Sequence, residues 1–155
     1  MDTLEKALTV DRQLCFAVYS AAHAFNRAYK PLLDKLGLTY PQYLVMMVLW
    51  EKNGLPVKDI GAKLNLDSGT LSPLLKRLEK LGMISRIRDA NDERQVVVGL
   101  TEQGKAAHKT ALDSIAPGIF TSLGCGTGEI SDLRDRLVKL RKTLDQSACH
   151  SANAG

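Results

Sequence analysis

Two short apolar stripes separated by a tight turn dominate the segment LPVKDIGAKLNLDSGTLSPLLKRLEKLGMISR, residues 55–86. The first stripe, Val57, Ile60 and Leu64, has the spacing of three and four residues that is typical of an amphipathic helix. The second stripe has a similar spacing and consists of Leu71, Leu74, Leu75, Leu78 and Leu81. Because the letters NLDSG between the stripes supply turn and cap residues, the segment predicts a helix-turn-helix.

A β-hairpin is predicted directly after this segment, in MISRIRDANDERQVVVGLT, residues 83–101. The letters RDAND are typical of a turn, and QVVVGL is rich in the β-branched residues that favour strands. A hairpin that follows the second helix of a helix-turn-helix is the wing of a winged-helix domain. The expected fold class is therefore mainly α with a small β-wing, a winged helix-turn-helix.

Further helices are predicted on both sides of this centre. Apolar residues recur every three or four positions from Leu14 to Leu36, so a long first helix is expected to begin near Thr9. A second helix over about residues 40–50 is apolar nearly all round and is therefore expected to be buried. After the wing, a helix capped by Thr101 precedes the flexible break GCGTG.

The flanking helices predict a homodimer. The last helix has an apolar face made of Ile130, Leu133, Leu137, Leu140 and Leu144. The winged-helix centre is too small to cover the apolar faces of all the flanking helices. The N- and C-terminal helices are therefore expected to be dimerisation helices that interleave with those of a second subunit.

These elements predict one domain over residues 1–147. Its DNA-binding part is expected at about 55–100 and its dimerisation part at about 10–36 and 101–147. Residues 148–155 are small and polar, so a flexible tail is expected there.

The composition is that of a soluble globular protein. The chain of 155 residues is 45% hydrophobic and 25% charged and has no apolar run long enough to span a membrane. The N-terminus lacks the apolar core of a signal peptide, so we expect a cytoplasmic protein. Three cysteines argue against a disulfide framework, and Cys149 with His150 does not make a zinc site. No metal and no cofactor are expected.

The positive charge is concentrated in residues 68–88. Five cations face one anion there, which equals the net charge of +4 of the whole chain; the cations are Lys76, Arg77, Lys80, Arg86 and Arg88. The segment is therefore a candidate nucleic-acid surface, although a solvated polar face explains the charge alone equally well.

Side chains at the start of the second helix of a helix-turn-helix reach the major groove of DNA. The residues at this position are Ser68, Gly69, Thr70, Ser72 and Lys76. Lys76 and Arg77 are suited to phosphate contacts, and Arg94 at the wing tip is suited to a narrow minor groove. Asp92 is expected to orient Arg94. A dimer is expected to bind a pseudo-palindromic operator in double-stranded DNA.

The order of elements resembles the MarR family of dimeric winged-helix transcriptional regulators over roughly residues 10–147. The wing DERQVVVGLTEQG has the pattern of that family; its matching residues are Asp92, Arg94, Leu100, Thr101 and Gly104. This resemblance implies binding to duplex DNA.

The first third of the chain resembles OhrR, the branch of that family that senses organic hydroperoxides. The matching features are Cys15, Tyr29, Tyr40 and the segment LGLTYPQYLVM. The resemblance implies that Cys15 is the peroxidatic cysteine and that the two tyrosines hydrogen-bond its sulfur. Cys125 is similar to the resolving cysteine of the two-cysteine subgroup, whereas the resemblance assigns nothing to Cys149.

The helical spacing of Cys15 and Tyr29 limits how they meet. They are fourteen residues apart, which places them within about 40° of one face but roughly 21 Å apart along a straight helix. They cannot touch within one such helix. They can touch when two first helices meet antiparallel across a two-fold axis, which agrees with the cross-dimer contact that the resemblance implies.

The thiol chemistry follows from the neighbours of each cysteine. Cys15 is expected in about the second turn of its helix, where the helix dipole favours a thiolate modestly, and phenol donors favour it more. Oxidation gives a sulfenic acid that condenses with a second thiol. Cys125 lies among Gly124, Gly126 and Gly128, which provide a mobile backbone for such a reaction.

The expected function is a repressor that binds operator DNA as a reduced dimer and is released by organic hydroperoxides. One alternative is a MarR-type repressor released by a small aromatic ligand, and a second is a thiol peroxidase. Cys15 can also be an inert core thiol, and His23 and His108 are expected on helix surfaces.

Overall fold

The computed structural model describes residues 8–152 and the side chains of residues 8–149. The fold is mainly helical with a small antiparallel wing, as predicted, and the sheet of the wing has three strands. The chain divides into two compact units after Phe120. Within the described range, no helix combines the length and the apolar character needed to cross a membrane.

The N-terminal helix begins later than the sequence predicts. A short 3-10 turn, η1 (Val10–Arg12), follows Thr9, and the long helix α2 spans Leu14–Leu33. The extended backbone of Gln13 separates the two elements. Thr9 therefore precedes the 3-10 turn and is not the cap of the long helix.

The second helix, α3 (Tyr40–Glu51), is the centre of the larger unit. Its start is fixed by the Gln42 side chain, which accepts a hydrogen bond from the backbone N–H of Thr39 at 2.9 Å. Val45, Met46 and Leu49 are fully buried, which confirms the expectation of a buried helix. The core around them includes Ile60, Leu71, Leu75, Leu78, Ile84 and Val98.

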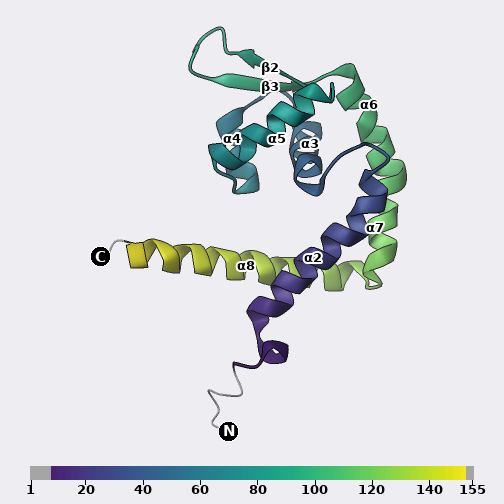
Figure 1. Cartoon of the computed structure of the whole chain (residues 1–155), viewed down its shortest axis with the longest axis vertical. Coiled ribbons are helices and arrows are strands. Elements are labelled where there is room, and N and C mark those ends of the chain that lie inside the picture. The colour runs from purple at the N-terminus through teal and green to yellow at the C-terminus, as the bar shows by residue number, and fades with distance from the viewer. Residues whose placement is uncertain (1–7, 153–155) are drawn as a thin grey trace. The chain divides into compact units, whose positions relative to one another are not determined.

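The winged helix-turn-helix follows α3. Helices α4 (Val57–Leu64) and α5 (Ser68–Lys80) precede the hairpin of β2 (Ile84–Arg88) and β3 (Val96–Leu100). Figure 1 shows α3, α4 and α5 gathered beside this hairpin. A two-residue strand, β1 (Leu55–Pro56), pairs with β3, so the strand order is β1-β3-β2. The strand β1 was not expected from the sequence, which predicted only the hairpin of β2 and β3.

Two residues allow the tight turn between α4 and α5. Asn65 adopts the left-handed backbone conformation, with φ of 54°, which asparagine tolerates better than most residues. A Cβ atom on Gly61 would lie 2.8 Å from the backbone oxygen of Leu66, so only glycine allows this close approach.

The helix after the wing begins as predicted. The Thr101 side chain accepts a hydrogen bond from the backbone N–H of Gly104 at 3.0 Å, which caps α6 (Glu102–Thr110). The helical path then continues through a π-helical turn, Ala111–Ile115, into α7 (Ala116–Leu123). The sequence did not predict this π-helical turn.

The smaller unit contains α8 (Thr127–Ala152). This helix continues into residues 148–152, where a flexible tail was expected, while residues 153–155 lie outside the described range. Several apolar residues of the predicted face remain exposed in the single chain, namely Leu133, Leu137 and Leu144.

Candidate functional site

The start of helix α5 is fixed by a side-chain cap. The Asp67 carboxylate accepts a hydrogen bond from the backbone N–H of Thr70 at 2.7 Å, and this bond lowers the pKa of Asp67 below its usual value. Leu71, Leu75 and Leu78 bury the opposite side of the helix in the core. The cap and the apolar stripe together position the polar start of α5 at the surface.

The predicted DNA-binding residues of α5 are all exposed. They are Ser68, Gly69, Thr70, Ser72, Lys76 and Arg77. The structure therefore places them on one helix with its buried stripe turned to the core, as a recognition helix requires.

The wing turn is held by Asp92 through the backbone. The Asp92 carboxylate accepts a hydrogen bond from the backbone N–H of Arg94 at 3.1 Å, and its carbonyl oxygen accepts one from Gln95 at 2.9 Å. Asp92 therefore stabilises the backbone of the turn that contains Arg94. In this structure, Asp92 orients Arg94 through the peptide backbone.

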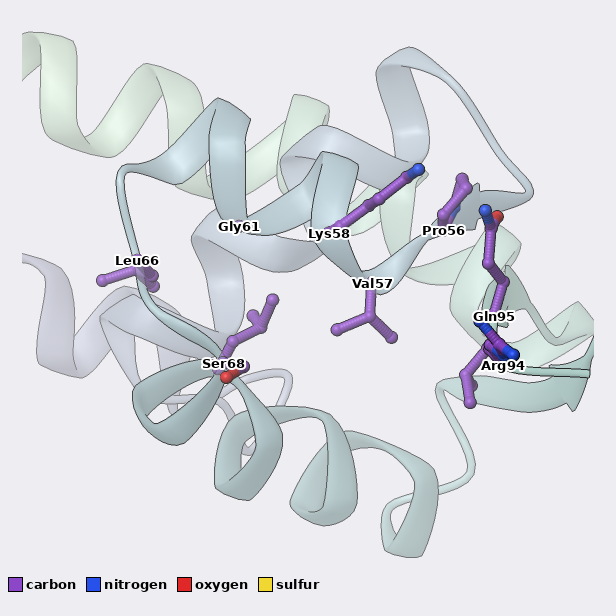
Figure 2. Close-up of a pocket in the computed structure, with 10 residues that line it drawn as sticks. Pro56, Val57, Lys58, Gly61, Leu66, Ser68, Arg94 and Gln95 are labelled. Atoms are coloured by element: carbon purple, nitrogen blue, oxygen red, sulfur yellow. The ribbon is translucent and has the colours of Figure 1, made fainter.

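A groove of about 420 Å³ lies between α4, the start of α5 and the wing. Figure 2 shows its lining, with Ser68 and Arg94 on different sides and Val57 between them. Lys58 of α4 and Gln95 of the wing also line it. Lys58 was not among the predicted DNA-binding residues, because it lies outside both the basic segment 68–88 and the wing. Its position in the first turn of a helix-turn-helix was the available signal.

Arg86 forms a structural ion pair with Glu79. Its guanidinium donates two hydrogen bonds to the Glu79 carboxylate, at 2.7 and 3.0 Å, and these bonds lower the pKa of Glu79. The pair joins α5 to β2 and is partly buried. Arg86 therefore holds the wing against the recognition helix, and it should not be counted among the cations presented to DNA.

Three tyrosines form a cluster between α2 and α3. The ring centroid of Tyr29 lies 4.7 Å from that of Tyr40 and 6.0 Å from that of Tyr43. Burial raises the pKa of all three phenols, and the nearby Tyr40 and Tyr43 help to raise the pKa of Tyr29 to about 12. The phenols therefore stay protonated at neutral pH and remain hydrogen-bond donors.

Cys15 lies in the first turn of α2, one turn earlier than predicted, because the helix begins at Leu14. Its side chain is exposed. Cys15 and Tyr29 belong to one continuous helix, so they are separated by roughly 21 Å along its axis. A single chain brings Tyr29 and Tyr40 together but does not bring Cys15 to them.

The other two cysteines are also free and exposed. Cys125 lies between α7 and α8, after Gly124, whose φ of +63° favours glycine. Cys149 lies within α8, in a segment that was expected to be flexible.

His108 differs from the sequence-based expectation. It is half-buried and stacks on Trp50 with a centroid distance of 5.0 Å, whereas an exposed helix position was expected. Trp50 also donates a hydrogen bond from Nε1 to the backbone oxygen of Gly104 at 2.9 Å. The contacts of Trp50 with His108 and Gly104 were not predicted, because helical spacing does not reveal contacts between distant parts of a chain.

The family follows from comparison with known proteins. The family model described as transcriptional regulator SarA/Rot matches residues 27–110, more than half of the chain. The chain belongs to the MarR/SarA family of winged-helix transcriptional regulators. It is thus a DNA-binding transcriptional regulator and not an enzyme, so the thiol peroxidase alternative is wrong.

Two curated relatives within this MarR/SarA group match most of the chain. The HTH-type transcriptional regulator TtmR of Methylorubrum extorquens is 51% identical over 140 residues, which are 90% of this chain and 71% of TtmR. The organic hydroperoxide resistance transcriptional regulator of Bacillus subtilis is 45% identical over 140 residues, which are 90% of this chain and 94% of that protein.

A solved MarR/SarA-type structure provides a DNA complex for comparison. The structure of reduced AbfR bound to DNA has a TM-score of 0.75 and 34% sequence identity, and the match covers 88% of this chain and 94% of that one. AbfR is a protein of Staphylococcus epidermidis. The similarity supports DNA binding by the winged helix-turn-helix of the present chain.

Proposed function

We propose that this regulator is a redox-sensing repressor of the cytoplasm. In the proposal, a reduced homodimer binds a pseudo-palindromic operator, and oxidation of Cys15 by an organic hydroperoxide releases it. The observation that carries the proposal is the pair of half-buried tyrosines, Tyr29 and Tyr40, whose ring centroids lie 4.7 Å apart and whose phenols can both donate hydrogen bonds. The similarity to a relative named as an organic hydroperoxide resistance regulator supports the choice of signal.

A second copy of the chain completes the proposed site. Exposed apolar residues line α2 in the single chain, namely Leu14, Phe16, Val18 and Phe25. Burial of such residues against a partner is the main favourable term in association. If two α2 helices meet antiparallel, Cys15 of one subunit approaches Tyr29 of the other, since both residues lie near one face.

The proposed reaction begins with the Cys15 thiolate. Its sulfur attacks the terminal oxygen of the hydroperoxide, the S–O bond forms, and the O–O bond breaks. The departing alkoxide takes up a proton and leaves as an alcohol, so Cys15 becomes a sulfenic acid. Hydrogen bonds from Tyr29 and Tyr40 favour the starting thiolate, because they stabilise its charged form.

Cys125 of the partner subunit is the proposed resolving thiol. Its sulfur attacks the sulfenic sulfur of Cys15, a disulfide forms, and the hydroxyl group leaves with a proton as water. The Gly124–Gly126 connection gives Cys125 an exposed position outside both neighbouring helices. The cross-link would change the relative placement of the two DNA-binding parts.

The required change in DNA affinity is moderate. A shift of operator occupancy from 99:1 to 1:99 needs about 5.5 kcal/mol of differential affinity between the two states. Loss of the thiolate–phenol hydrogen bonds and formation of a cross-subunit disulfide together act on the proposed dimer interface, and this interface sets the distance between the two recognition helices. We propose that this interface change supplies the difference.

A DNA-shift assay with and without tert-butyl hydroperoxide tests the proposal. The probe is a duplex selected from a random-sequence pool by the reduced protein. Wild type is expected to release this duplex after treatment, Cys15→Ser to bind and not release it, and Cys149→Ser to behave as wild type. Release of Cys15→Ser as readily as wild type would show that another signal, such as a small aromatic ligand, acts on the repressor.

A further inference from the structure

The base of the wing, residues 100–104, is tightly joined to the end of the recognition helix. The Thr101 hydroxyl donates to the carbonyl oxygen of Gly82 at 2.6 Å, and the Thr101 backbone N–H donates to that of Met83 at 3.1 Å. A Cβ atom on Gly104 would overlap the Met83 carbonyl oxygen, so the two segments are in close contact. A displacement of the wing base therefore displaces the DNA-reading elements.

Two side chains bind this wing base, namely Trp50 in the last turn of α3 and Asn53, two residues after the end of that helix. Trp50 Nε1 donates to the carbonyl oxygen of Gly104 at 2.9 Å. The Asn53 side-chain oxygen accepts from the backbone N–H of Leu100 at 2.8 Å and from that of Gly54 at 2.9 Å. The bonds to Gly104 and Leu100 join residues about fifty positions apart in the sequence, so these two bonds are long-range contacts of the fold.

The opposite end of α3 lies in the tyrosine cluster. Tyr40 is the first residue of the helix, and its ring packs on Tyr29 of α2. Tyr43 contacts Tyr29 and also Trp50, whose ring centroid lies 5.9 Å away. An unbroken series of ring contacts therefore runs from the cluster to the residue that binds the wing base.

We infer that Trp50 and Asn53 are positioning residues that couple the tyrosine cluster to the wing. This inference rests on the proposed function. It describes how oxidation of Cys15 beside the tyrosine cluster would change the position of the wing and so the affinity for DNA. Helix α3 is roughly 18 Å long and packed on most sides, and packed interiors transmit displacement because they have few voids. A shift at Tyr40 then moves α3 as a body, and Trp50 and Asn53 transfer the movement to the wing.

The first test measures the coupling itself. Fluorescence anisotropy gives the affinity for the selected duplex before and after tert-butyl hydroperoxide, and the ratio of the two dissociation constants is compared between variants. In Trp50→Phe and Asn53→Ala, we expect reduced-state affinity within about twofold of wild type and a ratio at least about fivefold smaller. Trapping of the Cys15 sulfenic acid with dimedone should proceed at the wild-type rate.

Two matched variants separate coupling from a loss of fold. Asn53→Asp keeps an acceptor for both backbone N–H groups and should restore the wild-type ratio. Gln103→Ala removes a side chain of the wing base that bonds Leu81 and not α3, so it should leave the ratio unchanged. An unchanged ratio in both Trp50→Phe and Asn53→Ala, even with lower thermal stability, would overturn the inference.

A second measurement needs no oxidation and separates this inference from the proposed function. Tyr40→Phe should shift the backbone amide NMR signals of Leu100 and Gly104, and the shifts should be smaller in an Asn53→Ala background. If hydroperoxide fails to release wild type, the proposed function fails, whereas these amide shifts still report the coupling. If the amide signals of Leu100 and Gly104 do not shift in Tyr40→Phe, this result would contradict the coupling directly.

Discussion

The ring centroids of Tyr29 and Tyr40 lie 4.7 Å apart although the two residues belong to different helices, α2 and α3. Their phenols have a raised pKa because of burial, so both can donate hydrogen bonds at neutral pH. Cys15 of the same chain lies roughly 21 Å from Tyr29 along α2. The donors are thus assembled within one chain, whereas the thiol they are proposed to serve must come from a second chain.

Tyr29→Phe should slow the oxidation of Cys15. The change removes one donor to the thiolate and keeps the ring that packs on Tyr40. Because a hydrogen bond to a charged group contributes about 1.5–3 kcal/mol, we expect at least about a tenfold lower rate of sulfenic acid formation. Stopped-flow mixing with tert-butyl hydroperoxide, followed by dimedone trapping and mass spectrometry, measures this rate.

Tyr43→Phe is the matched control for this prediction. Tyr43 belongs to the same cluster, and its phenol also has a pKa raised by burial, but no bond to the thiol is proposed for it. In Tyr43→Phe, the rate of sulfenic acid formation at Cys15 should remain within about twofold of wild type. Equal rates in Tyr29→Phe and wild type would remove Tyr29 from the proposed site.

Cys125→Ser should block the cross-link but not the first oxidation. Sulfenic acid formation needs only the activated thiolate of Cys15, whereas the disulfide needs a second thiol. After hydroperoxide treatment, wild type and Cys149→Ser should run as linked dimers on a non-reducing gel, and Cys125→Ser should run as a monomer. A linked dimer in Cys125→Ser that disappears in Cys149→Ser would identify Cys149 as the resolving thiol.

Arg94→Ala and Lys58→Ala should each weaken DNA binding and reduce its dependence on salt. Both residues line the groove between α4, α5 and the wing. Loss of one phosphate contact lowers the slope of log affinity against log salt by roughly one per site. Lys105→Ala, which removes an exposed cation paired with Glu102 in α6, should leave the slope unchanged.

An unchanged slope in Lys58→Ala, measured by anisotropy between low and moderate salt, would show that the groove takes no phosphate. The same result in Arg94→Ala would remove the wing tip from DNA binding.

Asp67→Ala should lower the stability of the recognition helix in a pH-dependent way. The cap to Thr70 lowers the pKa of Asp67, so its contribution is present above the ordinary value of 3.8 and is lost as pH falls through the lowered pKa. The urea midpoint of Asp67→Ala should be below that of wild type at pH 7, and the difference should shrink as pH falls below 3.8.

Asp67→Asn separates the acceptor from the charge. Asparagine is also a good N-cap, so this variant should retain most of the stability at pH 7. Its difference from Asp67→Ala should not depend on pH. A constant difference between wild type and Asp67→Ala over the same pH range would contradict the assigned cap.

Local patterns were sufficient for most of the helices and strands. The helix-turn-helix, the hairpin of the wing and the Thr101 cap depend on residues within a few positions of each other, and all three agree with the structure. The start of the first helix was misplaced because Thr9 is a good cap by residue type. The actual break at Gln13 has no comparable signal in the sequence.

The sequence by itself determined the winged helix-turn-helix, the residues on the exposed side of α5 and the family resemblance. Only the tertiary structure decided that Arg86 pairs with Glu79, that Lys58 and Arg94 share a groove, and that Trp50 binds Gly104. The physical reason is the range of the interactions. Helical periodicity records which residues are buried, but the choice of partner depends on how distant elements pack, and no local spacing encodes it.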